Sequence, residues 1–129
     1  MFEDQKFYKC KHCGNLVGMI YNSGAPLTCC DNEMEELVPN TVDAAVEKHL
    51  PVIKVESNKV TVTVGSTLHP MTEAHHIVWI YLKTSMGGQR KGLEIGMKPE
   101  AAFMLIEDEE ALEAFAYCNL HGLWKADVK

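Results

Sequence analysis

The chain has 129 residues, of which 47% are hydrophobic, a length that suits one ordinary domain or a small module followed by a larger domain. No apolar run reaches the ~18 residues that a membrane-spanning helix needs. The net charge of -6 argues against a nucleic-acid-binding protein, and any anionic substrate must be attracted by local positive charge. The first six residues are mostly polar or charged and lack the apolar stretch of a signal peptide, so we expect a cytoplasmic protein.

Four of the five cysteines lie in the first thirty residues. In a reducing compartment, an odd set with tight spacing favours metal binding over disulfides. Cys10 and Cys13 form a Cys-x-x-Cys knuckle followed by glycine, and Cys29 and Cys30 supply a second thiol pair. Four thiolates suit tetrahedral zinc or a single iron. Short strands are predicted at Phe7–Lys9 and Leu16–Tyr21, on either side of the knuckle.

Adjacent cysteines are unusual in such a module, because two neighbouring residues can approach one ion only with strained geometry. We therefore expect a distorted tetrahedron of sulfur atoms. Two alternatives remain open for the pair Cys29 and Cys30, a variant of the zinc ribbon and a vicinal disulfide. A module of this size buries too little surface to fold alone, so the metal must supply much of its stability. His12 lies inside the knuckle and is interpreted as a surface residue.

The next segment contains the first candidate histidine. Pro39-Asn40 is interpreted as a linker, and the following residues predict a short helix at Thr41–Lys48 with Thr41 as its N-cap. Pro51 prevents its continuation, which leaves His49 on a strained, exposed stretch. A solvated charged turn is the alternative for this stretch, whose neighbouring charged residues are Glu47 and Lys48.

Strand candidates follow at intervals of roughly ten residues, which is typical of a β-sandwich. They are Val52–Glu56, Lys59–Val64, Ile77–Leu82, Leu93–Met97 and Ala101–Ile106. Ser57-Asn58 and Met86–Gln89 are predicted turns, and Glu107–Phe115 is predicted as a loop followed by a strand. The predicted fold class is therefore all-β.

Near the end of the chain, Cys118 and His121 lie on one short turn, where a thiol and an imidazole can reach the same ion. Further upstream, each beside a turn-forming or rigid element, lie His49, His69 and His75. Together these residues predict a metal site with one sulfur and several nitrogens. His76 directly follows His75, and on a strand the two would face opposite ways, so at most one can join a given site.

These motifs occur together in one order, and the chain resembles the desulfoferrodoxin family, the two-iron superoxide reductases, nearly end to end. The residues that carry the resemblance are Cys10-x-x-Cys13 with Cys29-Cys30, Glu47-Lys48-His49-Leu50-Pro51, His69-Pro70-Met71 with His75, and Cys118-Asn119-Leu120-His121-Gly122-Leu123-Trp124. The resemblance implies a desulforedoxin-like Fe(Cys)4 module at residues 1–37 and an immunoglobulin-like β-sandwich with the catalytic domain at residues 38–129.

The resemblance also implies the ligands and the reaction. Iron in the sandwich would have four equatorial imidazoles and the axial thiolate of Cys118, and the imidazoles would come from His49, His69, His75 and His121. The implied reaction is the one-electron reduction of superoxide to hydrogen peroxide, with Lys48 attracting the anion and Glu47 reaching the oxidised iron after the product leaves. Backbone N–H groups of Leu120 or His121 are expected to tune the sulfur.

The implied partners are superoxide, a rubredoxin-like electron donor and a second copy of the chain in a homodimer. Two other functions compete with superoxide reduction. One is an electron-transfer protein that works through the Fe(Cys)4 centre and uses the β domain for docking. The other is a structural or interaction module that binds zinc.

Overall fold

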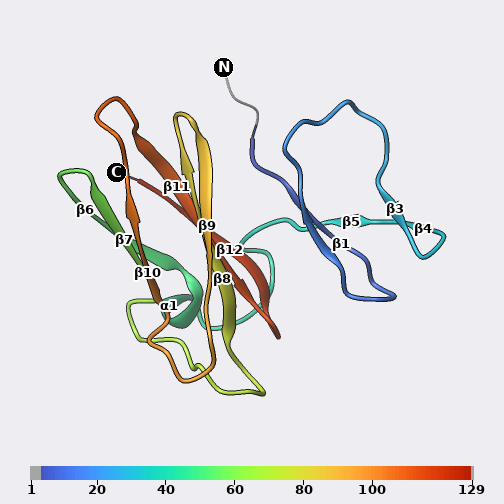
Figure 1. Cartoon of the computed structure of the whole chain (residues 1–129). Coiled ribbons are helices and arrows are strands. Elements are labelled where there is room, and N and C mark those ends of the chain that lie inside the picture. The colour runs from blue at the N-terminus through green and yellow to red at the C-terminus, as the bar shows by residue number, and fades with distance from the viewer. Residues whose placement is uncertain (1–3, 129) are drawn as a thin grey trace. The chain divides into compact units, whose positions relative to one another are not determined.

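The structure is a computed structural model that describes residues 4–128 (Figure 1). The chain divides into two compact units, the first ending at Val38 and the second beginning at Pro39. Strands dominate both units, and α1 (Val46–His49) is the one helix within the described range. No helix between residues 4 and 128 is long and apolar enough to span a membrane.

The first unit is built from very short strands. A three-stranded sheet has the order β2 (Leu16–Gly18), β1 (Phe7–Lys9) and β5 (Glu35–Glu36), and a small hairpin pairs β3 (Thr28–Cys29) with β4 (Asn32–Glu33). Its buried apolar side chains, within the described part, are Phe7, Cys10 and Met34. The predicted strand Leu16–Tyr21 is too long, since β2 ends at Gly18 and the side chain of Ile20 is fully exposed.

The second unit contains two antiparallel sheets. The three-stranded sheet has the order β10-β7-β6 and the four-stranded sheet the order β12-β11-β8-β9. The strands are β6 (Pro51–Glu56), β7 (Lys59–Val64), β8 (Ile77–Thr84), β9 (Gly87–Gly92), β10 (Glu100–Met104), β11 (Ala111–Cys118) and β12 (Gly122–Asp127).

The core of this unit lies between the two sheets. Every second residue of β7 is fully buried, because apolar valines alternate with polar threonines along this strand. These valines pack with apolar side chains of β8, β10 and β11 in one cluster: Val60, Val62, Val64, Ile77, Ile80, Leu82, Ala101, Phe103, Leu105, Ala114, Ala116 and Cys118. Two sheets packed over one apolar core form the predicted immunoglobulin-like β-sandwich, and the all-β prediction is confirmed.

Three local predictions are wrong. Leu93–Met97 forms no strand, because Gly96 takes a positive φ of 89° and the Met97 amide donates to the Glu94 carbonyl to close a turn. The β8–β9 turn is tighter than predicted, since Thr84 already pairs with Gly87 and residues 87–89 belong to β9. The predicted helix Thr41–Lys48 shrinks to α1, which lacks a side-chain cap at Ala45.

Other local predictions are confirmed. Ser57-Asn58 joins β6 to β7, with Glu56 paired to Lys59, and the segment after Glu107 is a loop followed by β11. Between Cys118, the last residue of β11, and Gly122, the first of β12, lies the predicted short turn. The ends of strands and the loops beside them therefore carry the histidines and Cys118 at one end of the sandwich.

Candidate metal centres

In the first unit, the sulfur atoms of Cys10, Cys13, Cys29 and Cys30 all lie within 4.8 Å of one another. Cys13 Sγ is 3.6 Å from Cys29 Sγ, and Cys29 Sγ is 3.9 Å from Cys30 Sγ. Tetrahedral metal–sulfur bonds of ~2.3 Å place neighbouring sulfurs ~3.8 Å apart. The cluster therefore fits one tetrahedral ion. Since 3.9 Å is far beyond a covalent S–S bond, the alternative of a vicinal disulfide is wrong.

Local backbone geometry brings the two thiol pairs together. The Cys13 amide donates to Cys10 Sγ over 3.5 Å, as expected for the first knuckle. In the second pair, Cys30 and Asp31 take positive φ angles of 51° and 62°. This left-handed bend turns the chain into the β3–β4 hairpin and lets adjacent cysteines face one point. Both residues thus take a conformation that is uncommon outside glycine, and the distorted tetrahedron stays a prediction.

Hydrogen bonds within the cluster shift the pKa values of Cys10 and Cys30 in opposite directions. The Cys13 amide lowers the pKa of Cys10 to about 6, because it stabilises the thiolate. A thiol–thiol hydrogen bond with Cys13 raises the pKa of Cys30 to about 12. Metal binding must release the protons that remain on these sulfurs.

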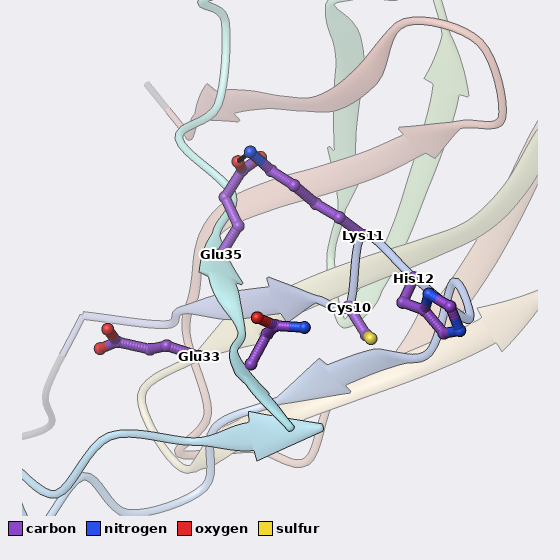
Figure 2. A pocket seen from close by; sticks show the side chains of 6 residues that line it. Cys10, Lys11, His12, Glu33 and Glu35 are labelled. Carbon is purple, nitrogen blue, oxygen red and sulfur yellow. Dashed lines mark ion pairs between the residues drawn. The ribbon is translucent and has the colours of Figure 1, made fainter. Parts of the chain in front are cut away.

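Figure 2 shows the surface hollow beside Cys10, which is also lined by Lys11, His12, Glu33 and Glu35. Lys11 and Glu35 form an ion pair of 2.7 Å across the exposed rim. His12 lies on the surface, and the sulfur cluster does not include it, in line with its interpretation as a surface residue. Because both partners of the ion pair are well exposed, the pair contributes little to stability.

The second unit brings together the histidines that precede its strands and the turn after β11. Ligand atoms of His49, His75, Cys118 and His121 lie within 4.8 Å of one another. His69 joins them, because its Nε2 is 3.2 Å from the Nε2 of His49. The structure thus collects all five residues from positions between 49 and 121 of the chain. The His76 ring, in contrast, donates Nδ1–H to the Thr72 carbonyl over 2.9 Å.

The four imidazoles form a closed ring. Neighbours in this ring have centroids 4.5 to 5.1 Å apart and interplanar angles of 76 to 84°, in the order His49, His69, His75, His121. His49 and His75 lie opposite each other, with centroids 6.2 Å apart and an interplanar angle of 34°. Four edge-on rings that surround one point are the arrangement of a square of equatorial ligands.

Distances between the ring nitrogens test whether one ion fits. Metal–nitrogen bonds of ~2.1 Å at right angles place adjacent nitrogens ~3.0 Å apart. His49 Nε2 is 3.1 Å from His121 Nδ1 and 3.2 Å from His69 Nε2. His75 Nε2 is buried and has no hydrogen-bond partner within residues 4–128. A buried nitrogen without a partner is costly, and a metal ion at the centre of the ring would satisfy it.

Carbonyl groups fix the direction of two imidazoles. Nδ1 of His49 donates to the Ala45 carbonyl and Nδ1 of His69 to the Pro70 carbonyl, each over 2.7 Å. Both Nε2 lone pairs therefore point into the ring. Burial lowers the pKa of His49 and lowers that of His69 to about 4, which keeps both rings neutral and able to bind metal. His49 is buried, so the predicted exposed stretch and the solvated turn are both wrong for it.

Cys118 is fully buried, and its burial raises the pKa of the thiol. The His121 amide donates to Cys118 Sγ over 3.4 Å, and the amides of both His121 and Leu120 act on this pKa in the opposite direction. The expected backbone donors to the sulfur are thus present. Trp124 contacts the cluster as well, stacking on His49 with a centroid distance of 4.8 Å and donating Nε1–H to the His121 carbonyl.

Glu47 and Lys48 are both exposed on α1, immediately before His49. The positive charge of Lys48 contributes to the lowered pKa of His49 and of His75, although burial is the larger cause for each. Lys48 thus acts electrostatically on imidazoles at opposite sides of the ring. The role of Lys48 in attracting an anion stays a prediction.

Sequence reasoning missed the support for this segment. A Cβ atom on Gly65 would lie 2.6 Å from the Glu47 carbonyl oxygen and 2.9 Å from the Lys48 carbonyl carbon, so this position tolerates only glycine without movement of the backbone. The Thr67 amide donates to the same Glu47 carbonyl over 2.9 Å. A glycine directly after a buried strand was the available signal.

Fold and sites together define a two-unit metalloprotein, with a four-sulfur centre in a small β module and a four-imidazole, one-thiol centre in a β-sandwich. The family described as "Desulfoferrodoxin" matches residues 41–127, and "Desulfoferrodoxin, N-terminal domain" matches residues 3–37. Desulfoferrodoxin from Syntrophotalea carbinolica is 46% identical over 127 residues, which cover 98% of this chain and 99% of the relative.

A solved structure extends the likeness to three dimensions. The crystal structure of the superoxide reductase from Treponema pallidum has a TM-score of 0.82 and 40% sequence identity, and the match covers 97% of this chain and 100% of that chain. The superoxide reductase of Pyrococcus horikoshii is 36% identical and covers 64% of this chain and 87% of its own length. The chain belongs to the desulfoferrodoxin family.

Proposed function

We propose that this protein is a superoxide reductase whose catalytic iron is held by His49, His69, His75, His121 and Cys118. The observation that carries the proposal is the closed ring of four imidazoles, whose nitrogen spacing fits one ion, with a buried thiol beside it. Relatives and solved neighbours that bear the name superoxide reductase support it.

The reaction combines one superoxide, one electron and two protons to give one hydrogen peroxide. Iron held there would supply the electron and a positive charge that attracts the anion. Four neutral imidazoles would leave that charge uncompensated, and hydrogen bonds to carbonyls hold two of them in the tautomer that binds metal. The Cys118 thiolate would donate electron density to the metal, as thiolates do in haem proteins.

Lys48 supplies the local field that the net charge of -6 makes necessary. A positive charge ~4 Å from an anion contributes ~1 kcal/mol in water and ~4 kcal/mol at an effective dielectric of 20. Screening limits the opposing charge of distant residues to about 8 Å at physiological salt. Lys48 also orients a water molecule that donates a proton to the product, and Glu47 on the same turn closes over the cluster after the product leaves.

The second iron is held by Cys10, Cys13, Cys29 and Cys30. We propose residues 1–37 as the domain of this centre and residues 38–129 as the catalytic domain, and the division of the chain at Val38 and Pro39 supports this assignment. Exposure of Cys13 and Cys30 supports a path by which electrons enter or leave the four-sulfur centre. A rubredoxin-like donor, a homodimer and a cytoplasmic location complete the proposal.

The test is the stoichiometry of the reaction. Anaerobically purified protein with its iron measured is mixed rapidly with superoxide, and peroxide and oxygen are quantified. We expect one peroxide for each superoxide and no oxygen, whereas oxygen equal to peroxide would identify a dismutase. Cys13→Ser should retain this activity at the other iron, and its loss would favour an electron-transfer protein that works through the four-sulfur centre.

A further inference from the structure

Asn119 joins the two loops that carry the late ligands of the sandwich. Its backbone amide donates to the His76 carbonyl over 3.1 Å, and its side-chain oxygen accepts from the His76 amide over 2.8 Å. Its side-chain nitrogen donates to the Ala74 carbonyl over 3.0 Å. Three hydrogen bonds thus connect the turn of Cys118 and His121 with both neighbours of His75.

This bridge lies where the regular pairing of β8 with β11 ends. The register shifts between Tyr117 and Cys118, and Cys118 pairs with Ile77, the first residue of β8. Beyond that pair, the Asn119 side-chain oxygen takes the place of a backbone carbonyl as the acceptor for the His76 amide, while the Asn119 backbone amide donates to the His76 carbonyl. A primary amide offers one acceptor and donors in the required positions, whereas a carboxylate of the same shape lacks the donor to Ala74.

The loop around His75 closes largely on itself apart from this bridge. The His75 amide donates to Thr72 Oγ1 and the Thr72 amide to the His75 carbonyl, and Nδ1 of His76 lies 2.9 Å from the Thr72 carbonyl oxygen. These bonds shape the loop but leave its place relative to Cys118 and His121 undetermined. The Asn119 bridge supplies that connection at the residues on either side of His75.

We propose that Asn119 is a positioning residue that holds His75 in register with Cys118 and His121. This inference rests on the metal site proposed above. Asn119 acts through His75, whose Nε2 is buried in the ring without a hydrogen-bond partner in the described chain. Losing an outer-shell partner of a ligand typically lowers metal affinity by ~10- to 100-fold. We expect Asn119→Ala to weaken Fe(II) binding at the sandwich site by that factor.

A matched control exists at Asn40. Its backbone amide donates to the Leu123 carbonyl over 3.0 Å, its side-chain nitrogen donates to the Lys125 carbonyl over 3.0 Å, and its side-chain oxygen accepts from the Lys125 amide over 2.8 Å. Neither connected segment contains a proposed ligand; Trp124, which lies between Leu123 and Lys125 and stacks on His49, is also held by the β11–β12 ladder through its pairing with Ala116. Asn40 also has a φ of 63°, so alanine there adds backbone strain and Asn40→Ala should be no more stable than Asn119→Ala.

The experiment titrates the metal-free proteins with Fe(II) under anaerobic conditions and records, after oxidation, the charge-transfer band of the Cys118 centre. Expected are a ~10- to 100-fold lower affinity at the sandwich site and a shifted or broadened band for Asn119→Ala, with wild-type values for Asn40→Ala. Asn119→Asp keeps the acceptor for His76 and loses the donor to Ala74, so its Fe(II) affinity should fall between those of Asn119→Ala and Asn40→Ala. This variant takes the place of Asn119→Ala if the alanine variant fails to fold.

Unchanged affinity and band in both Asn119 variants, beside a wild-type protein that binds iron, would overturn this inference alone. Equal losses in Asn119→Ala and Asn40→Ala would also overturn it, because they would indicate a general loss of stability. A wild-type protein that takes up no iron in the sandwich would overturn the proposed function and this inference together.

Discussion

The two metal centres of this chain are assembled in opposite ways. The four sulfurs of the first unit come from residues 10 to 30 and rest on strands of two or three residues with few buried apolar side chains. The five donors of the second unit come from residues 49 to 121 and lie at the end of a sandwich with a continuous apolar core. In the first unit the metal must stabilise the fold, whereas in the second the fold positions the donors.

Burial follows the same division. Cys13 and Cys30 are exposed, whereas His49, His69 and Cys118 are buried. Exposure suits a centre that exchanges electrons with another protein. Burial of the donors keeps the imidazoles neutral and the site rigid, so that the centre presents one charged, preformed position to a small anion.

Removing metal should produce the largest difference between the units. Chelation should unfold the first unit, since structural metals contribute ~10–16 kcal/mol of apparent binding free energy in small modules. The sandwich should keep its structure. Hydrogen exchange checks this, with β1 and β2 losing protection while β8 and β11 retain it. Protected amides in the metal-free first unit would contradict the comparison.

Replacing one sulfur in each unit should have separate effects. Cys118→Ser should abolish the charge-transfer band of the sandwich centre and lower superoxide reduction by at least ~100-fold, the upper range for outer-shell losses. The buried hydroxyl should cost ~1–3 kcal/mol of unfolding free energy. Visible spectra and denaturant unfolding measure both. Cys13→Ser is the matched control and should remove the other band; a retained sandwich band in Cys118→Ser would identify another axial ligand.

A smaller effect is expected where the sandwich supports α1. Gly65→Ala should push against the backbone of Glu47 and Lys48 and lower the free energy of unfolding by ~1–3 kcal/mol, typical of overpacking. Fe(II) affinity should fall with it, because His49 directly follows. Gly92→Ala is the control, as a Cβ there meets nothing within 4 Å, and should stay within ~0.5 kcal/mol. Equal stability of the two variants would remove Gly65 from this role.

The smallest effect should come from the exposed charge. Lys48→Ala should raise the activation free energy of the reaction with superoxide by ~1 kcal/mol, which lowers the second-order rate constant about fivefold. The dependence of this rate constant on ionic strength should also become flatter. Rapid mixing at several salt concentrations measures both quantities. Lys54→Ala removes the same charge from an exposed position on β6 and should leave the rate unchanged. If the two variants behave alike, Lys48 attracts the anion no more than any surface lysine.

The fold class could be predicted from the sequence, because apolar and polar β-branched residues alternate along β7 and turn residues separate the strands. Prediction failed at Leu93–Met97, where a turn replaced the expected strand, and at Thr41–Lys48, where bends precede a helix that begins only at Val46. Local preference is weak in both segments, and packing decided their conformation. Their outcome matters for function, since the short α1 brings His49 into the core where an exposed stretch was predicted.

Residue types and their spacing were sufficient to predict a four-sulfur centre, since its donors are close in sequence, and a second site with one sulfur and several nitrogens, whereas the resemblance to the desulfoferrodoxin family implied the full donor set of that second site. The order of the imidazoles around the ring, with His49 opposite His75, depends on how two sheets pack and on where their loops meet. So do the supports from Gly65, Trp124 and Asn119; of these only Gly65, a glycine directly after a strand, carries a signal in the sequence. Ligand chemistry is a property of side chains and can be recognised in the chain, whereas distances between residues far apart in sequence exist only once the core has formed.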